Sequence, residues 1–192
     1  MAKIVMGPHI LISPMQTLLV GANVNDKPNF MAVTWGAVAS HQPPMISVAI
    51  RHQRYTLRGI RQNMTFSVNV PSTDILRETD YCGITSGDIV DKVEVCRFKV
   101  FYGELNNAPL IEQCPINLEC KVVHILDLGS HSLVIGMVEE THVSEDCLTD
   151  GKPDINKIKP FMFTPIPTAQ YRVLSNDIAK IGSIGKALKT KQ

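Results

Sequence analysis

The sequence predicts a mainly β fold with some helices, arranged as an antiparallel barrel with helical caps. Short apolar segments typical of strands dominate the first two thirds of the chain, and turn residues such as Asn25-Asp26-Lys27-Pro28 separate them. Helical segments are few and do not alternate strictly with the strands, which argues against a parallel sheet with crossover helices. The 192 residues, 44% of them hydrophobic, suffice for one domain with a buried core, and we expect a single domain over 1–192.

The strands are predicted from apolar runs and from alternation. Leu18 to Val24 is a continuous apolar run, and Phe30 to Ala39 resumes after the turn. Phe66 to Val70 alternates with period two, so Phe66, Val68 and Val70 should share one face. The other predicted strands are Ile46 to Ile50 after a Gln42-Pro43-Pro44 turn, Ile116 to Leu126 and Ser132 to Glu139 around a turn at Asp127-Leu128-Gly129-Ser130, and the shorter Phe98 to Tyr102 and Gln170 to Val173.

Four segments carry helical signals. Tyr55 to Asn63 is amphipathic, with Leu57 and Ile60 opposite two arginines. The other predicted helices are Ser72 to Cys82, capped by Ser72 and Gly83; a helix that Ser86-Gly87-Asp88 opens and that runs through Val95; and a helical C-terminal tail over residues 175–192.

Charge and hydropathy give no support to several classes of partner. The net charge is +1 without a long single-sign run, so nothing indicates a nucleic acid or an anionic membrane surface as partner. Ile4 to Asn25 and Pro28 to Ile50 lack charged residues, but internal prolines argue against a membrane span in either. The five cysteines and six histidines lack disulfide or metal-site spacing, and there is no export signal. We therefore expect a cytoplasmic protein without a bound metal.

Two junctions carry the candidate chemistry. Around Trp35, small residues such as Gly36, Ala37 and Ala39 let a flat ligand approach the backbone. Arg51 to Thr56 then crowds cations and hydroxyls at a strand-to-helix junction, where free N–H groups favour a phosphate. A solvated helix face is the alternative reading of these arginines.

The second junction is Ser86-Gly87, followed by Lys92. It offers N–H donors and a cation, although an ordinary N-cap with an Asp91/Lys92 surface pair explains it as well. Neither a dinucleotide-binding glycine motif, nor a P-loop, nor the nucleophile elbow of hydrolases occurs.

Taken in order, these segments resemble the flavin reductase-like family, and most closely its flavoredoxin branch, over residues 14–174. The resemblance implies an FMN-binding split barrel that forms a homodimer with the flavin near the subunit interface. It is carried by five motifs: Asn29-x-x-Ala32-Val33-Thr34-Trp35, Pro43-Pro44 before a strand, Arg54-x-Thr56, Phe66-x-Val68-Asn69-Val70-Pro71, and Asp80-Tyr81-Cys82-Gly83-x-x-Ser86-Gly87-x-x-x-Asp91-Lys92.

The resemblance also implies roles for individual residues. The flat, mostly apolar ring of the flavin is expected against one group of residues and its phosphate against two others. The ring would contact Thr34, Trp35, Gly36, Ala49 and Ile50; the phosphate would contact Arg51, Arg54, Tyr55 and Thr56; and Ser86, Gly87 and Lys92 would form a second polar clamp.

His131 is the candidate catalytic residue. Family members that reduce free flavin often carry Gly-Asp-His before a late strand, and the matching stretch here is Gly129-Ser130-His131. The function implied is a flavin-dependent oxidoreductase of the NAD(P)H:flavin reductase type that passes hydride or electrons through FMN. Because serine replaces the acid, a non-catalytic FMN electron carrier that docks a redox partner protein is the alternative. A cofactor-free barrel acting as a binding module is a third reading.

Overall fold

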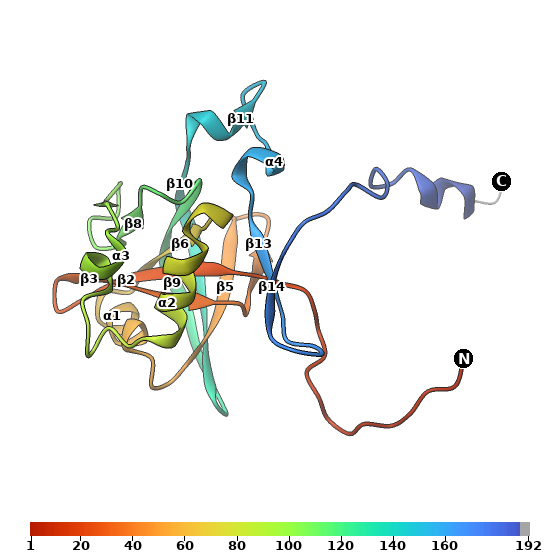
Figure 1. The fold of residues 1–192 in the computed structure, drawn as a ribbon. Helices are drawn as coiled ribbons and strands as arrows, with labels where there is room; N and C mark the ends of the chain where they lie inside the picture. Colours follow the sequence, from red (N-terminus) through yellow and green to blue (C-terminus); the bar gives the residue numbers. More distant parts are fainter. Residues whose placement is uncertain (189–192) are drawn as a thin grey trace.

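The computed structural model describes residues 1–188. The chain folds around a seven-stranded antiparallel sheet, and both terminal segments leave the body on the same side (Figure 1). In spatial order its strands are β3 (Lys27–Val33), β2 (Leu18–Val24), β6 (Thr65–Val70), β9 (Ile116–Leu128), β10 (His131–Val143), β5 (Met45–Arg51) and β4 (Gly36–Ser40).

Smaller elements surround this sheet. The helices are α1 (Tyr55–Asn63), α2 (Leu76–Ile84), α3 (Lys92–Cys96) and α4 (Ile155–Ile158), with 3₁₀ turns at Thr73–Ile75, Glu145–Cys147 and Ile184–Leu188. A three-stranded sheet joins β1 (Met15–Gln16), β13 (Phe161–Thr164) and β14 (Gln170–Val173), and two short pairs join β7 (Val100–Phe101) to β8 (Leu110–Ile111) and β11 (Leu148–Thr149) to β12 (Lys152–Pro153).

The main sheet curls because its two edge strands are consecutive in the chain. β3 and β4 lie at opposite edges, yet only Thr34 and Trp35 connect them. The edges must therefore approach each other at this corner, where the N–H of Ala49 donates to the carbonyl oxygen of Trp35 at 2.8 Å. Within the described residues no ladder pairs β3 with β4, so the barrel is split rather than closed. The predicted single strand Phe30 to Ala39 is wrong for this reason: the corner divides it.

Both faces of β2 and β6 are buried, which explains the continuous apolar run of β2. Val20, Phe66 and Val68 belong to the core inside the curled sheet, and Val70 joins them, which confirms the predicted common face. Leu19 belongs to a second apolar cluster on the other face of the sheet, beside α2 and α3. The barrel therefore has helices packed outside it as well as a filled interior.

Helix α1 matches its predicted bounds, and it fixes the position of the strand that precedes it. Leu57 and Ile60 are buried in the inner core. Gly59 lets the helix lie directly against β2: a Cβ atom there would come within 2.2 Å of the carbonyl oxygen of Asn23. The N-terminus of α1 is thus held firmly at the end of β5.

Several predicted boundaries are wrong. Gly83 lies within α2, and Thr85 is the C-cap. Ser86-Gly87-Asp88 opens no helix, because Asp91 accepts hydrogen bonds from the N–H groups of Val93 and Glu94 and so starts α3 at Lys92. The turn between β9 and β10 contains only residues 129–130. In the predicted tail helix only Ile184–Leu188 is helical, as a 3₁₀ turn, and residues 189–192 lie outside the described residues.

Two predicted strands also have the bounds that their patterns indicated. β2 spans Leu18–Val24 and β14 spans Gln170–Val173. The turn after β2 is shorter than expected: Asn25 and Asp26 both have positive φ, and β3 begins directly at Lys27. Two consecutive residues with positive φ make the tight hairpin turn that matches strand twist.

None of the helices in residues 1–188 has the length and apolar character needed to cross a bilayer.

Candidate functional site

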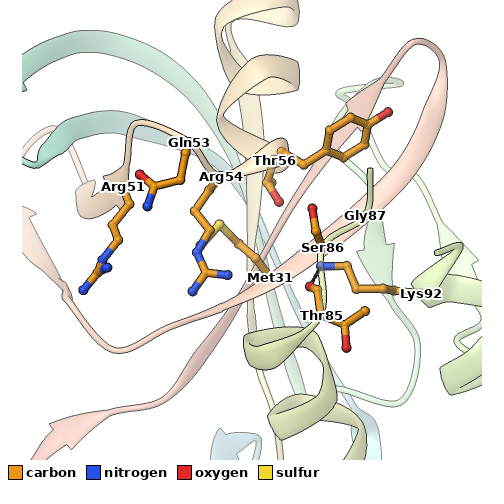
Figure 2. Close-up of a pocket in the computed structure, with 10 residues that line it drawn as sticks. Met31, Arg51, Gln53, Arg54, Thr56, Thr85, Ser86, Gly87 and Lys92 are labelled. Carbon is orange, nitrogen blue, oxygen red and sulfur yellow. Dashed lines mark hydrogen bonds between the residues drawn. The ribbon is translucent and has the colours of Figure 1, made fainter. Parts of the chain in front are cut away.

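Two adjoining cavities form one groove between the sheet corner and the start of α1. Each has a volume of about 200 Å³, and they share Met31, Arg51 and Arg54. The first cavity, drawn in Figure 2, is also lined by Gln53, Tyr55, Thr56, Thr85, Ser86, Gly87 and Lys92. The second is also lined by Ala32, Val33, Thr34, Trp35, Ala49 and His131.

The N-terminus of α1 opens into the first cavity. Arg54 occupies the N-cap position, and within residues 1–188 its side chain makes no capping hydrogen bond. Tyr55 and Thr56, the first residues of the helix, both line the cavity, and the first turn contains no acidic residue. Helix N-termini present unsatisfied N–H groups and a partial positive charge. The arrangement therefore suits an anion.

Lys92 enters the cavity from the opposite side to Arg54 (Figure 2). The residue is 3% exposed, and its Nζ donates to the carbonyl oxygens of Thr85 at 3.3 Å and Cys82 at 3.5 Å. No carboxylate of residues 1–188 forms an ion pair with it. Burial lowers the pKa of Lys92, and the nearby Arg54 lowers it further. An anion bound in the cavity would stabilise the charged form of this buried side chain, so the arrangement suits a negatively charged ligand.

Arg54 and the loop of Thr85, Ser86 and Gly87 complete the polar wall of the first cavity. The guanidinium of Arg54 donates to the carbonyl oxygen of Gly83 at 3.1 Å, which ties the start of α1 to the end of α2. The following loop brings Ser86 and Gly87 to the cavity. The hydroxyl of Ser86 accepts a hydrogen bond from the N–H of Asp88 at 3.3 Å, so this loop is braced within itself.

A buried amide lies behind this wall. Asn29, on β3, donates from Nδ2 to Oγ1 of Thr56 at 2.6 Å. Gly87 packs against the same amide, because a Cβ atom at Gly87 would lie 1.9 Å from Oδ1 of Asn29. The first helical turn and the Ser86-Gly87 loop therefore meet on one side chain of the sheet.

The second cavity is flatter and carries the aromatic groups. The ring of His131 stacks on the indole of Trp35, with centroids 4.6 Å apart and an angle of 26° between the planes. The hydroxyl of Ser130 lies 2.7 Å from Nδ1 of His131. Burial lowers the pKa of His131, and Arg51 and His52 lower it further. A neutral imidazole over an indole therefore stands at this end of the groove.

The structure brings eleven of the thirteen predicted site residues to the groove. They are Thr34, Trp35, Ala49, Arg51, Arg54, Tyr55, Thr56, Ser86, Gly87, Lys92 and His131. The side chain of Ile50 is fully buried in the inner core, so only its backbone can face the groove. Gly36 begins β4 next to the corner and, in the described part of the chain, lines neither cavity.

Sequence reasoning did not assign Met31, Gln53, Thr85 or Asn29 to the site. Gln53 and Thr85 sit next to predicted residues, so proximity in sequence could have found them. Met31 lies on β3 among residues of the family motif. A methionine at such a position is usually predicted to fill the hydrophobic core, so it was not assigned to the site. Asn29 lies in the motif, yet its contact with Thr56 spans 27 positions and becomes visible only in the fold.

Cys82 lacks the surroundings of a reactive thiol. It is fully buried beside Cys96, and burial, with a contribution from Cys96, raises its pKa to about 12. A thiol with so high a pKa is protonated near neutral pH, and only the thiolate is nucleophilic. Among the described residues no cluster of three or more His, Cys, Asp or Glu side chains could hold a metal ion.

The fold and the groove define a class: a split-barrel protein with a groove suited to an anion and a flat ring. The family model for the flavin reductase like domain matches residues 12–159. The chain belongs to the flavin reductase-like family.

Solved structures place it in the flavoredoxin branch of that family. The flavoredoxin of Methanosarcina acetivorans is 39% identical with a TM-score of 0.93, over 98% of this chain and 100% of that one. The flavoredoxin of Desulfovibrio vulgaris (Miyazaki F) is 34% identical with a TM-score of 0.87, over 96% and 100%. A putative flavin reductase from Shewanella frigidimarina with a split barrel domain is 18% identical with a TM-score of 0.76, over 88% and 85%, and supports the fold alone.

Proposed function

We propose that the groove binds FMN and that the protein is an oxidoreductase passing hydride or electrons through it. The first cavity would hold the phosphate, between the N-terminus of α1 and Lys92. The second would hold the isoalloxazine ring against Thr34, Trp35 and Ala49. When bound, FMN supplies hydride and electron transfer at its ring. The chain supplies binding, orientation and the electrostatic surroundings.

The observation that carries this proposal is the burial of Lys92 without a carboxylate partner in residues 1–188. Arg54, the open helix N-terminus and the hydroxyl of Thr56 converge on the same cavity. Such a donor set suits a phosphate monoester, because charge-assisted bonds to an anion are strong when water is excluded. The cavity supports FMN over riboflavin, which carries no phosphate.

The bound flavin should therefore depend on the charge of Lys92. Wild-type protein is expected to carry a yellow chromophore that, once released, is identified as FMN by mass spectrometry. Lys92→Met keeps the length of the side chain and removes its charge. We expect FMN affinity to fall about 10- to 100-fold, as for loss of a charged hydrogen bond, with riboflavin affinity unchanged.

Lys99→Met is the matched control, because Lys99 forms a surface ion pair with Glu112 at 3.6 Å. It should bind FMN as the wild type does. Wild-type protein that carries no flavin and does not bind added FMN would contradict the proposal, and it would favour the reading of a cofactor-free binding module.

A second candidate function is an electron carrier without a small-molecule substrate. The surroundings of His131 in the second cavity favour it. Ser130, rather than a carboxylate, contacts His131, and the imidazole is occupied by stacking on Trp35. Steady oxidation of NADH or NADPH by the FMN-loaded protein would support the enzyme. Flavin reduction only through a partner protein would support the carrier.

We further propose a homodimer with the flavin near its interface. β4 is an edge strand, and its Val38 is 74% exposed. Leu126 and Leu128 are exposed at the end of β9, and Leu128 pairs with His131 of the groove. An apolar edge beside a ligand groove suits burial by a second copy, and a stable dimer needs about 800 Å² from each partner.

Light scattering tests the dimer. The wild type should have twice the mass of the chain. Val38→Lys combined with Leu126→Lys should give a monomer that binds FMN more weakly, whereas Val95→Lys, an exposed position on α3, should leave the mass unchanged. A wild-type monomer that binds FMN would contradict this assembly without affecting the flavin assignment.

The five cysteines support a reducing compartment. All five are free thiols, and four are buried. Structural thiols of this kind are typical of proteins that stay in the cytoplasm. We therefore propose a cytoplasmic location, which fractionation of cells that express the protein would test.

A further inference from the structure

Asn29 makes a hydrogen bond whose direction matters for the groove. Asn29 and Thr56 are almost completely buried residues, at 5% and 1% exposure. Nδ2 of Asn29 lies 2.6 Å from Oγ1 of Thr56. An amide nitrogen can only donate, so the threonine oxygen accepts this bond.

The proton of the Thr56 hydroxyl must therefore point elsewhere. A hydroxyl has one proton and two lone pairs, and here one lone pair is occupied from behind. In front of Thr56 lies the first cavity, which it shares with Arg54 and Lys92. Asn29 thus leaves Thr56 as a donor toward the cavity, on the side where both cations lie.

The orientation of the amide is fixed by close packing. Oδ1 of Asn29 faces Gly87, where a Cβ atom would lie only 1.9 Å away, and 3.0 Å from Cδ1 of Tyr55. Any residue other than glycine at position 87 would push the amide away from Thr56. The absence of a side chain at Gly87 therefore leaves room for the amide of Asn29, and this amide holds the hydroxyl of Thr56.

We propose that Asn29 is a positioning residue that turns the Thr56 hydroxyl toward the flavin phosphate and so sets the preference for FMN over riboflavin. The inference rests on the proposed function, since it needs a phosphate in the first cavity. Asn29 itself lines neither of the two groove cavities in the described part of the chain, and it acts through Thr56.

The test compares two ligands that differ only in the phosphate. Asn29→Ala and Asn29→Asp are titrated with FMN and with riboflavin, following the flavin fluorescence. Asn29→Ala should lower FMN affinity about tenfold, as for one hydrogen bond to a charged group, and change riboflavin affinity less than twofold. Asn29→Asp keeps the size of the side chain but accepts the Thr56 proton and adds a negative charge, so its loss for FMN should be larger.

Two further variants separate positioning from general stability. Gly87→Ala should reproduce the selective loss of FMN, because it displaces the amide. Asn63→Ala is the control: Asn63 donates to the carbonyl oxygen of Asn23 at 2.7 Å and ties the opposite end of the same helix to β2. It should leave the ratio of FMN to riboflavin affinity at the wild-type value.

Each other outcome overturns the inference. If Asn29→Ala weakens both ligands equally, Asn29 has only a structural role, and if it weakens neither, the contact with Thr56 does not matter for binding. Wild-type protein that does not bind FMN would overturn the proposed function itself. Wild-type protein that prefers FMN, with the same preference in Asn29→Ala, would overturn this inference alone.

Discussion

The imidazole of His131 and the indole of Trp35 are stacked at one end of the groove, with centroids 4.6 Å apart. Trp35 forms the corner between the two edge strands of the main sheet, and His131 is the first residue of β10. The contact therefore joins the corner to the β9–β10 hairpin. Trp35 is the only tryptophan of the chain, so tryptophan fluorescence reports on the surroundings of this one residue.

The fluorescence of Trp35 should titrate with His131. Burial, together with Arg51 and His52, lowers the pKa of His131, so the ring stays neutral at pH values where a free histidine is partly charged. We expect the emission of the flavin-free protein to fall as the pH is lowered, because an imidazolium quenches an adjacent indole. The midpoint should lie below about 6.5, the ordinary histidine value.

His131→Asn should abolish this transition, whereas His124→Asn, at an exposed position of β9, should leave it unchanged. A midpoint at or above the ordinary histidine value, or a transition that survives in His131→Asn, would contradict the stacked arrangement in solution.

Arg54 and Thr56 together should contribute much of the binding free energy of the FMN phosphate. Both line the first cavity, and each can give a charge-assisted hydrogen bond worth about 1.5–3 kcal/mol. We expect Arg54→Ala combined with Thr56→Ala to lower FMN affinity by roughly 100-fold or more, measured by calorimetry.

Arg58→Ala is the matched control for this double variant. Arg58 lies one turn further along α1, over the ring of Tyr55 and 3.7 Å from Asp88, and in the described residues it lines neither cavity of the groove. It should bind FMN within about twofold of the wild type, since exposed ion pairs contribute little. Unchanged affinity in the double variant would remove the phosphate from this end of the groove.

Local patterns predicted the parts of the fold that local forces determine. The amphipathic spacing of Leu57 and Ile60 gave the bounds of α1, and the apolar run gave those of β2. The corner at Thr34 and Trp35 was missed, because strand propensity continues through it and only the curling of the sheet breaks it. Long-range geometry, rather than composition, decides where that strand ends.

In the candidate site, too, the locally determined features were predictable and those that depend on long-range contacts were not. The cations and hydroxyls at the start of α1 were predictable, because a strand-to-helix junction concentrates N–H donors. The sequence also predicted a helix from Ser86, whereas Asp91 caps α3 and leaves that loop free to face the groove. Asn29 was missed because its role depends on contacts with Thr56 and Gly87, which come from other parts of the chain.

The stability of the fold should require glycine at position 59, because α1 packs there directly against the backbone of β2. A Cβ atom would lie 2.2 Å from the backbone oxygen of Asn23, which cannot move without distorting β2. Overpacking of this kind costs about 1–3 kcal/mol, so Gly59→Ala should lower the melting temperature by roughly 2–12 °C. Gly129→Ala is the control, because nothing lies within 4 Å of its added Cβ atom. Equal melting temperatures for the two variants would contradict the close packing of α1 on β2.

Asp127 anchors the end of the β9–β10 hairpin to α1, and this anchor should weaken in acid. It accepts hydrogen bonds from Ser132 at 2.6 Å and from Arg61 at 2.5 Å. The bond from Ser132, and then Arg61, lower the pKa of Asp127 below its ordinary value. Its contribution to stability is therefore present above the unfolded-state pKa, about 3.9, and is lost as the pH falls through the lower folded-state value.

Asp127→Asn should accordingly speed amide hydrogen exchange in the hairpin near neutral pH and remove the acid-dependent change there. The effect should stay local, because the group is exposed and the core does not depend on it. Asp150→Asn, in the turn between β11 and β12, should leave exchange in the β9–β10 hairpin unchanged. Hairpin exchange that is identical in Asp127→Asn and the wild type at pH 7 would show that β9 and β10 hold His131 in place without this anchor.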